Sequence, residues 1–315
     1  MKPPLLIVNP TCGKQDPRTL PQVLAGVERT LGDVVIRYTA RRGHAEELAR
    51  EAAGEGHSLI VAVGGDGTLS EVVNGVLSAA DARLVAEPPV VGLIDAGTGG
   101  DFRRSLGIGA GYERSLEALA LERVRFVDVG KATFPGPSGQ PMTHYFVNVI
   151  SAGLGGRVDH YIERIPGFVG GKTAYYMASL WAVVTGSEQP VLARITWNGE
   201  TRDEVVPAFL VAVCNGRWFG GGMDLAPMAL PDDGRLEVVT ITERNKLFLL
   251  AKTRTIYAGR HLDEPTVTHF PCERIELRLE SEPAQRRYLL DVDGDALGSL
   301  PLTIEVQKQR LPIRA

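Results

Sequence analysis

Apolar and polar positions follow one spacing in the first part of the chain and another in the rest. Up to about residue 122, short apolar runs alternate with segments whose apolar residues recur every three or four positions. Short runs are typical of buried strands, and the longer segments are typical of amphipathic helices. Such alternation predicts a parallel sheet covered by helices. Strands are predicted at residues 5–8, 34–39, 59–63 and 89–94, and helices at residues 20–31, 43–56, from 68 onward and 112–122.

From about Phe126 onward, the pattern predicts mostly strands. Two helical patterns interrupt them, at Thr173 to Thr185 and at Lys246 to Tyr257. We therefore predict two domains, residues 1–128 and 129–302, and the pattern leaves open whether residues 303–315 return to the first. The predicted strands of this part are residues 144–150, 191–197, 205–214, 236–242, 274–280 and 300–306.

The composition fits two ordinary globular domains and argues against some partners. A chain of 315 residues is longer than one hydrophobic core usually serves. Its formal net charge of -4 gives no general attraction to nucleic acid, so we expect no nucleic-acid partner. The cysteines Cys12, Cys214 and Cys272 are widely spaced, which favours free thiols in a reducing compartment.

No segment of the sequence predicts membrane insertion. The apolar stretch AYYMASLWAVV, which begins at Ala174, is shorter than the ~20 residues that a spanning helix needs. The N-terminal residues hold too few apolar positions for the core of a signal peptide. We expect a cytoplasmic protein whose contact with membranes is peripheral only.

The segment GGDGTLSEVVNG places glycines around one carboxylate at the end of a predicted buried strand. Gly64 and Gly65 carry no Cβ, so the backbone there can turn sharply and approach a ligand closely. Gly67 and Thr68 begin the following helix, whose N-terminus favours negative charge. Asp66 would repel a bare phosphate unless a magnesium ion mediates between the two, directly or through water. The segment therefore indicates a site for nucleotide phosphates and a metal.

The same residues also fit a structural interpretation, in which the glycines form a turn and Asp66 caps the helix. Two further loops weigh against it, because NPTCGK follows the first predicted strand and GTGGDFRR follows the fourth. Parallel strands deliver the loops at their carboxyl ends to one edge of the sheet. We therefore expect three polar, glycine-containing loops to converge where open α/β sheets bind ligands.

Six segments, in this order, resemble the diacylglycerol kinase catalytic-domain family, which includes sphingosine and ceramide kinases and bacterial soluble lipid kinases. The resemblance covers nearly the whole chain. It implies a Rossmann-like nucleotide-binding α/β domain, as in NAD kinases and diacylglycerol kinases, followed by a lipid-binding β-sandwich, with ATP and the lipid meeting between them. The segments are NPTCGK, GHAEELA, GGDGTLSEVVNG, GTGGDFRRSLG, GGGMDLAPMALPDDGRLEVV and DVDGDALGSLP.

The resemblance also implies roles for residues of the first domain. Asp66 would hold Mg2+ through water, and Asp101 would lie in the region of the metal and the reacting hydroxyl. Arg104 would bind phosphate or form a structural pair. The residues expected to line the nucleotide are Asn9, Thr39, Gly64, Gly65, Gly67 and Thr68.

By the same alignment, the catalytic base that takes the proton of the lipid hydroxyl is Asp295. The family has glutamate at this position, so the carboxylate of this chain is one methylene shorter. Gly100 is a second departure, because the family usually shows asparagine there. Asp291 and Asp293 lie in the same segment as Asp295, and a role as charges at a strand edge stays open for them.

Asp233 has two interpretations. The run of Asp232, Asp233 and Gly234 is typical of a tight turn, whereas its match to a longer family segment implies a structural magnesium site with Asp233 as a ligand. The segment PGFVGGKT, from Pro166 to Thr173, is similar to a phosphate loop, but it lacks the first glycine and a preceding strand. We expect that segment to form a turn into the helix after it.

The leading hypothesis is an ATP-dependent lipid kinase that transfers the γ-phosphoryl group to a lipid hydroxyl. Diacylglycerol is the first candidate, and a sphingoid or other lipid is the alternative. An NAD kinase is a second hypothesis, since NAD kinases share the GGDG loop, but their usual NE segment after that loop is not evident here. A catalytically impaired nucleotide-binding regulatory protein is the third, motivated by Gly100 and Asp295. Relatives imply a homodimer formed through the β-domain.

Overall fold

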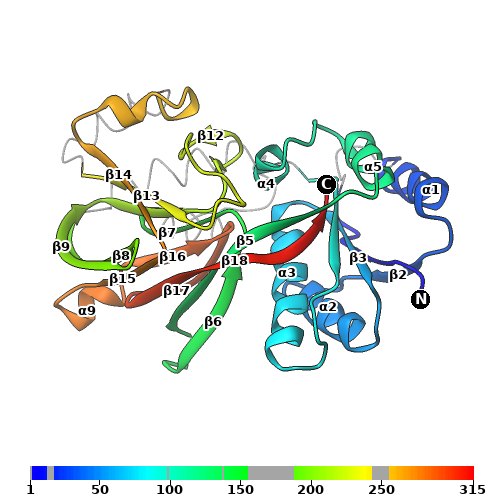
Figure 1. The fold of residues 1–315 in the computed structure, drawn as a ribbon, viewed down its shortest axis with the longest axis horizontal. Helices are drawn as coiled ribbons and strands as arrows, with labels where there is room; N and C mark the ends of the chain where they lie inside the picture. The colour runs from blue at the N-terminus through cyan, green and yellow to red at the C-terminus, as the bar shows by residue number, and fades with distance from the viewer. Residues whose placement is uncertain (1, 13–17, 98, 137, 155–187, 243–254) are drawn as a thin grey trace.

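The computed structural model describes residues 2–12, 18–97, 99–136, 138–154, 188–242 and 255–315. Helices cover a sheet at one end of the molecule, and strands predominate at the other end (Figure 1). Three parallel strand pairs lie in the first part of the chain, and the antiparallel pairs lie in the second. The predicted fold class, a parallel α/β part followed by an antiparallel β part, is confirmed.

Four parallel strands form the sheet of the first half. Their order is β2 (Val35–Tyr38), β1 (Leu5–Val8), β3 (Leu59–Gly64) and β4 (Val90–Asp95). Every residue of β1 is buried. Burial on both faces is expected for a parallel strand between two helix layers, and it explains why this strand is a continuous apolar run.

Helices pack on both faces of this sheet. On one face lie α2 (His44–Gly54) and α3 (Asp66–Asp81), and on the other lie α1 (Thr19–Leu31) and α5 (Tyr112–Ala120). Helices α2 and α3 approach closely at Gly75, where a Cβ would lie 2.3 Å from the carbonyl oxygen of Glu46. Glycine is therefore required at this position by the helix packing, since any other side chain would separate the two helices.

The second half is built from two sheets with a shared apolar core. The ten-stranded sheet continues beyond β4 through β18 (Leu302–Arg314), β15 (Arg274–Arg278), β8 (Gln189–Trp197) and β9 (Glu200–Ala208), while β5 (Val124–Pro135) pairs with β18 and with β6 (Pro141–Phe146). The order of the six-stranded sheet is β14 (Val267–Cys272), β13 (Leu236–Ile241), β10 (Leu210–Cys214), β7 (Val149–Gly153), β16 (Leu289–Val292) and β17 (Asp295–Ser299).

Three short helical elements and a small hairpin are also part of the described fold. Helix α4 (Asp101–Ser105) follows β4, and the hairpin of β11 (Trp218–Phe219) and β12 (Met223–Asp224) contacts it. A 3-10 helix, η1 (His261–Asp263), and helix α9 (Glu282–Gln285) lie in the second half.

The last strand, β18, joins the two halves. It pairs antiparallel with β5 and β15, and its end pairs in parallel with β4 through Ile313 and Val91. Figure 1 shows this strand in red, running from the β-rich half to a C-terminus beside the parallel sheet. One sheet therefore continues across residue 128, and the division of the chain into two domains stays a prediction.

Two predicted strands are each divided in the structure, which corrects the pattern-based boundaries. The stretch 144–150 becomes the end of β6 and the start of β7, because the chain leaves one sheet for the other at Val147 and Asn148. The stretch 205–214 is divided in the same way at Phe209, between β9 and β10. All three of these residues are buried, so the apolar pattern gave no sign of the change of sheet.

Some predictions concern residues outside the described ranges. These are the segment PGFVGGKT, the helix predicted at 173–185, and residues 246–254 of the second predicted helix. In the described ranges, no helix combines the length and apolar character needed to cross a membrane. Cys12, Cys214 and Cys272 are free thiols, as predicted.

Candidate functional site

The loops after β3 and β4 meet at the carboxyl edge of the parallel sheet. A Cβ at Gly97 would lie 2.5 Å from the Cα of Gly65. The two backbones can come this close because residue 97 is a glycine, whereas a Cβ at Gly65 would lie 3.4 Å from the Cα of Gly97. Thr68 packs against Gly64 in the same turn. Its hydroxyl oxygen lies 2.4 Å from the position that a Cβ of Gly64 would take.

The ends of β1 and β2 place two further predicted residues at this edge. The backbone N–H of Asn9 donates to the carbonyl of Val63 at 3.0 Å, and the N–H of Thr39 donates to the carbonyl of Val8 at 2.9 Å. The side-chain oxygen of Asn9 accepts hydrogen bonds from the N–H and hydroxyl of Thr11. The carboxyl ends of three neighbouring strands therefore carry Asn9, Thr39 and Gly65, as the sequence pattern required.

Asp66, the first residue of α3, holds the loop after β4. Its carboxylate oxygens accept the backbone N–H of Asp101 at 3.1 Å and that of Phe102 at 3.2 Å. Burial raises the pKa of Asp66, and the carboxylate of Asp101 raises it further. A Cβ at Gly99 would lie 2.7 Å from Oδ2 of Asp66. Asp66 is therefore enclosed by backbone on one side and repelled by a like charge.

Asp101 links the first half to the β-rich half. Its Oδ2 accepts the backbone N–H of Gly221 at 2.7 Å, in the turn between β11 and β12. Its Oδ1 accepts a hydrogen bond from Nη1 of Arg104 at 2.6 Å. Burial raises the pKa of Asp101, although the N–H of Gly221 and the charge of Arg104 oppose this effect. Arg104 thus forms an ion pair in this structure, and phosphate binding by Arg104 stays a prediction.

Gly100, where the family usually has asparagine, lies against an ion pair. Its φ of +67° is in the left-handed region, and a Cβ would lie 2.5 Å from Oδ2 of Asp95 and 2.8 Å from Nε of Arg103. Asp95 and Arg103 are joined at 2.7 Å, and both side chains are almost completely buried. The space into which a side chain at 100 would project is therefore occupied by this pair, which explains the glycine.

The terminal motif DVDGD forms a hairpin between β16 and β17. Its two turn residues, Asp293 and Gly294, have φ of +50° and +91°, as a two-residue turn of type I′ requires. The carboxylate of Asp293 accepts backbone N–H groups of Val147, Asn148 and Val149 at 2.9 to 3.1 Å. Asp293 therefore satisfies the backbone where the chain changes sheets. Burial raises the pKa of Asp293 to about 7, although the three hydrogen bonds oppose this effect.

Asp295, the predicted base, contacts the first half of the chain. Its Oδ1 accepts a hydrogen bond from Nη2 of Arg42 at 2.5 Å, and Arg42 lies in the loop between β2 and α2. The charge of Asp66 also acts on Asp293, the neighbour of Asp295 in the hairpin. The terminal hairpin therefore lies against the same edge of the sheet that carries the glycine loops.

Two residues of the segment GGDGTLSEVVNG have contacts that the sequence did not reveal. The carboxylate of Glu71 accepts the backbone N–H of Gly43 at 2.8 Å and that of Ala45 at 3.0 Å, and so fixes the start of α2. The side chain of Asn74 exchanges two hydrogen bonds of 2.8 Å with the backbone of Tyr145 in β6. Their partners lie 26 to 71 positions away in sequence, and no local pattern identifies such pairs.

Asp233 lies in a turn before β13, next to a positive charge. Its carboxylate is 2.9 Å from Nε of Arg235. Asp128, fully buried below the turn, accepts the backbone N–H of Gly234 at 2.6 Å and that of Gln309 at 2.7 Å. Among the residues that the structure describes, no three His, Cys, Asp or Glu side chains are grouped as metal ligands. A structural magnesium ion at Asp233 stays a prediction.

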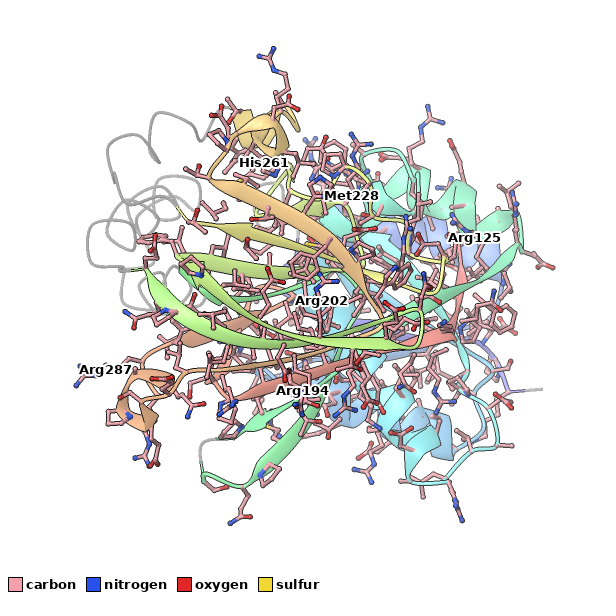
Figure 2. The ribbon with its side chains drawn as sticks, turned by 60° about the vertical axis from the view of Figure 1, so that its left-hand side comes forward. Arg125, Arg194, Arg202, Met228, His261 and Arg287 are labelled. Atoms are coloured by element: carbon pink, nitrogen blue, oxygen red, sulfur yellow. The ribbon has the colours of Figure 1, made fainter. Side chains whose placement is uncertain are left out.

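A hollow of about 470 Å³ lies elsewhere, on β8, β9, β15 and β18. Arg194, which is labelled in Figure 2, and Arg278 line it together with the acidic side chains of Asp203 and Glu276. Arg194 and Asp203 are themselves paired at 2.8 Å. The hollow includes none of the predicted site residues, so it is separate from the loops described above.

Comparison with known proteins identifies the family. The model of the diacylglycerol kinase catalytic domain matches residues 3–132, and the model of the YegS C-terminal NAD kinase beta sandwich-like domain matches residues 148–315. A diacylglycerol kinase of Bacillus subtilis (strain 168) is 30% identical over 306 residues, which cover 96% of this chain and 92% of the relative. The chain belongs to the diacylglycerol kinase catalytic-domain family. It is an enzyme, a lipid kinase.

Two further matches agree with membership of the diacylglycerol kinase family. A YegS-like lipid kinase of Chromohalobacter salexigens is 34% identical over 230 residues, which cover 70% of this chain and 67% of the relative. A crystal structure of a Bacillus anthracis protein that carries the diacylglycerol kinase name superimposes with a TM-score of 0.74 at 25% identity, over 99% of this chain and 94% of that one. Membership of this kinase family implies ATP as the phosphoryl donor.

Proposed function

We propose that this lipid kinase transfers the γ-phosphoryl group of ATP to the hydroxyl of diacylglycerol. The contact of the terminal hairpin with the first half carries the proposal, because it brings the predicted base Asp295 to the edge that holds the glycine loops. A donor site on one half and a base from the other are what transfer between two bound substrates requires. The names of relatives along most of the chain favour diacylglycerol as acceptor.

The proposed nucleotide site is the edge formed by the loops after β1, β2 and β3. Backbone N–H groups of Gly65, Gly67 and Thr68, at the start of α3, would face the phosphates, since a helix N-terminus favours negative charge. Asn9 and Thr39 lie at the ends of the two neighbouring strands. The close approach of Gly65 and Gly97 leaves this edge free of side-chain bulk, which supports the close contact of backbone and phosphate.

The acidic groups of the site fit a magnesium ion that arrives with the nucleotide. Asp66 and Asp101 are buried, and burial raises the pKa of each carboxylate although hydrogen bonds from neighbouring groups oppose this effect. Mg2+ prefers oxygen ligands, keeps several waters, and is usually held by one or two carboxylates together with substrate phosphates. Asp66 would hold the ion through water. When bound, the ion would neutralise charge on the phosphates.

The proposed reaction needs one group to accept a proton. As the hydroxyl oxygen of the lipid forms a bond to the γ-phosphorus, the bond to the bridging oxygen of the β-phosphate breaks and ADP leaves. The proton of the hydroxyl passes to the carboxylate of Asp295. Asp101 would orient the groups around the metal and the reacting hydroxyl. The phosphorylated lipid is the second product.

A lipid-panel kinase assay tests the proposal. Radiolabelled ATP and Mg2+ are supplied with diacylglycerol, sphingosine, ceramide or NAD, and each product is identified by chromatography. We expect transfer to diacylglycerol. Transfer only to a sphingoid lipid would change the acceptor, transfer only to NAD would reject lipid phosphorylation, and nucleotide binding without any transfer would favour the impaired regulatory protein. The same samples, run on a sizing column and on vesicles, test the predicted homodimer and peripheral membrane contact.

A further inference from the structure

An ion pair joins the two halves of the chain at the proposed site. Nη2 of Arg42 donates to Oδ1 of Asp295 at 2.5 Å, across 253 positions of sequence. The side chain of Asp295 is 20% exposed and that of Arg42 is 54% exposed, so water reaches the guanidinium more than the carboxylate. The pair therefore lies at the surface of the site, with the carboxylate on its inner side.

Both partners of this pair are attached to well-anchored backbone. The residue after Arg42 is Gly43, whose N–H is held by the carboxylate of Glu71 on α3 at 2.8 Å. Asp295 follows a turn that is fixed by three hydrogen bonds from backbone N–H groups to Asp293. Helix α3 begins at Asp66, directly after the glycine loop. The same helix therefore anchors both the glycine loop and Gly43, the residue that follows Arg42.

The neighbouring arginine shows that this contact is specific to one position. Arg41 donates to both carboxylate oxygens of Glu47 at 2.7 Å, within the same loop and helix α2. Its side chain is 60% exposed. The two adjacent arginines therefore make different contacts. Arg41 pairs with helix α2, which follows it in the chain, and Arg42 reaches the other half of the molecule.

We propose that Arg42 is the positioning residue of the base, holding the carboxylate of Asp295 in the place from which it receives the proton of the lipid hydroxyl. The inference rests on the proposed function. A carboxylate one methylene shorter than glutamate has a smaller reach, so it can compensate less for a displacement from the substrate hydroxyl. A guanidinium supplies several donors in a fixed plane and suits this task better than a point charge.

Steady-state kinetics of Arg42→Gln, Arg42→Lys and Arg41→Gln test the proposal. Misplacing a catalytic group by about 1 Å can cost up to about 100-fold in rate. For Arg42→Gln we expect kcat to fall about 10- to 100-fold with the KM for ATP within about twofold of wild type. Arg42→Lys recovers part of kcat because it keeps the charge, and Arg41→Gln, the matched control, retains wild-type kcat. An unchanged kcat in Arg42→Gln overturns the proposal, as does a raised KM for ATP with normal kcat.

A second comparison asks whether Arg42 acts only through Asp295. Arg42→Gln is introduced into the Asp295→Asn chain, and residual transfer is measured with radiolabelled ATP. A positioning residue has nothing left to position there, so the double variant should match Asp295→Asn within about twofold, a strongly non-additive result. A further tenfold loss would show that Arg42 contacts a substrate directly and would overturn the proposal. A wild-type chain that phosphorylates no lipid rejects the proposed function and this inference together, whereas an active wild type with an unaffected Arg42→Gln rejects only the inference.

Discussion

The two ends of α3 both face the β-rich half, and they treat acidic side chains in opposite ways. At its start, the charge of Asp66 lies near that of Asp101, and the pKa of Asp66 is raised by burial and by this neighbour. At its end, Asp81 receives the hydroxyl of Tyr145 and the cationic groups of Lys131 and Arg310, the latter two at 3.0 Å each. Although burial opposes them, these hydrogen bonds lower the pKa of Asp81.

The difference separates function from stability along one helix. Buried carboxylates whose pKa stays raised in the folded protein cost free energy of folding, and they are characteristic of sites that bind a cation or a reacting group. Acidic side chains that accept hydrogen bonds from several nearby donors, as Asp81 does, hold secondary-structure elements together. Between the two ends, Asn74 connects the middle of α3 to His144 and Tyr145 of β6. We therefore expect substitutions at the start of α3 to remove activity, and substitutions farther along to reduce stability.

The largest effect is expected for Asp66→Asn at the start of the helix. We expect kcat to fall about 100-fold or more, because the proposed magnesium ion loses a carboxylate. The free energy of unfolding at neutral pH should change little, because removing a buried charge that repels Asp101 offsets the loss of one acceptor for the N–H groups of Asp101 and Phe102. Kinase assays and urea unfolding at neutral pH measure the two quantities. A stability loss that accounts for the lost activity would assign Asp66 to structure instead.

Asp293→Ala should be the most damaging substitution for stability. It leaves the N–H groups of Val147, Asn148 and Val149 without their acceptor and puts alanine at a positive φ. We expect a loss of at least about 3 kcal/mol, from about 1–3 kcal/mol for each of the three buried donors left unpaired. Urea unfolding gives this value. Asp293→Asn is the control, since asparagine tolerates the left-handed region and retains one acceptor, and an equal loss in both variants would contradict the explanation.

The acid sensitivity of the protein should depend on His144 in the middle region. Burial lowers the pKa of His144 to about 4. The unfolded chain takes up this proton near its ordinary pKa of about 6.5, so stability is lost as pH falls from about 6.5 to about 4, by about 3 kcal/mol in all. His144→Gln retains a neutral acceptor for Asn74 and should show a shallower loss in this window. Unfolding at a series of pH values measures it, and parallel curves for the two proteins would refute the assignment.

Asp81→Asn, at the far end of α3, should have the smallest effect. Its two cationic partners are partly exposed, so we expect a loss of about 1 kcal/mol in the free energy of unfolding, reduced by added salt. Activity per folded molecule should equal that of wild type, which makes this variant the counterpart of Asp66→Asn. The midpoint of urea unfolding and the kinase rate are compared in one preparation. A loss of activity without a loss of stability would remove the contrast between the ends.

The helix-covered half could be predicted well because each of its signals is local. Its strands are continuous apolar runs, its helices have a regular apolar spacing, and glycine-containing loops follow three of its strands. The edge occupied by Asn9, Thr39 and Gly65 then follows from the geometry of any parallel sheet. In the β-rich half, the pattern identified strands such as β8, β13 and β15, but it did not predict β5, β14, β16 or β17. It also missed where β6 passes into β7 and β9 into β10. Burial of Val147, Asn148 and Phe209 conceals those changes of sheet.

The sequence-based prediction of the candidate site had the same limit, because it missed contacts between distant segments. The motif identified Asp66, Asp101 and Asp295 as residues of interest, but not what each one contacts. A turn of Asp and Gly between apolar runs is a hairpin signal, and it could have assigned Asp293 and Gly294 to the turn and Asp295 to the following strand. The partners of these residues come from distant segments, as Arg42 and Asp295 do across 253 positions.

By itself, then, the amino-acid sequence determined the alternation of strands and helices, the loops that meet at one sheet edge, and the membership in a family of lipid kinases. Those properties depend on neighbours a few positions apart or on motifs in a fixed order. Only the tertiary structure decided which carboxylates are compensated and which are left to repel one another. It did so because a charge in a folded protein responds to the distances of groups that the chain brings together from far apart.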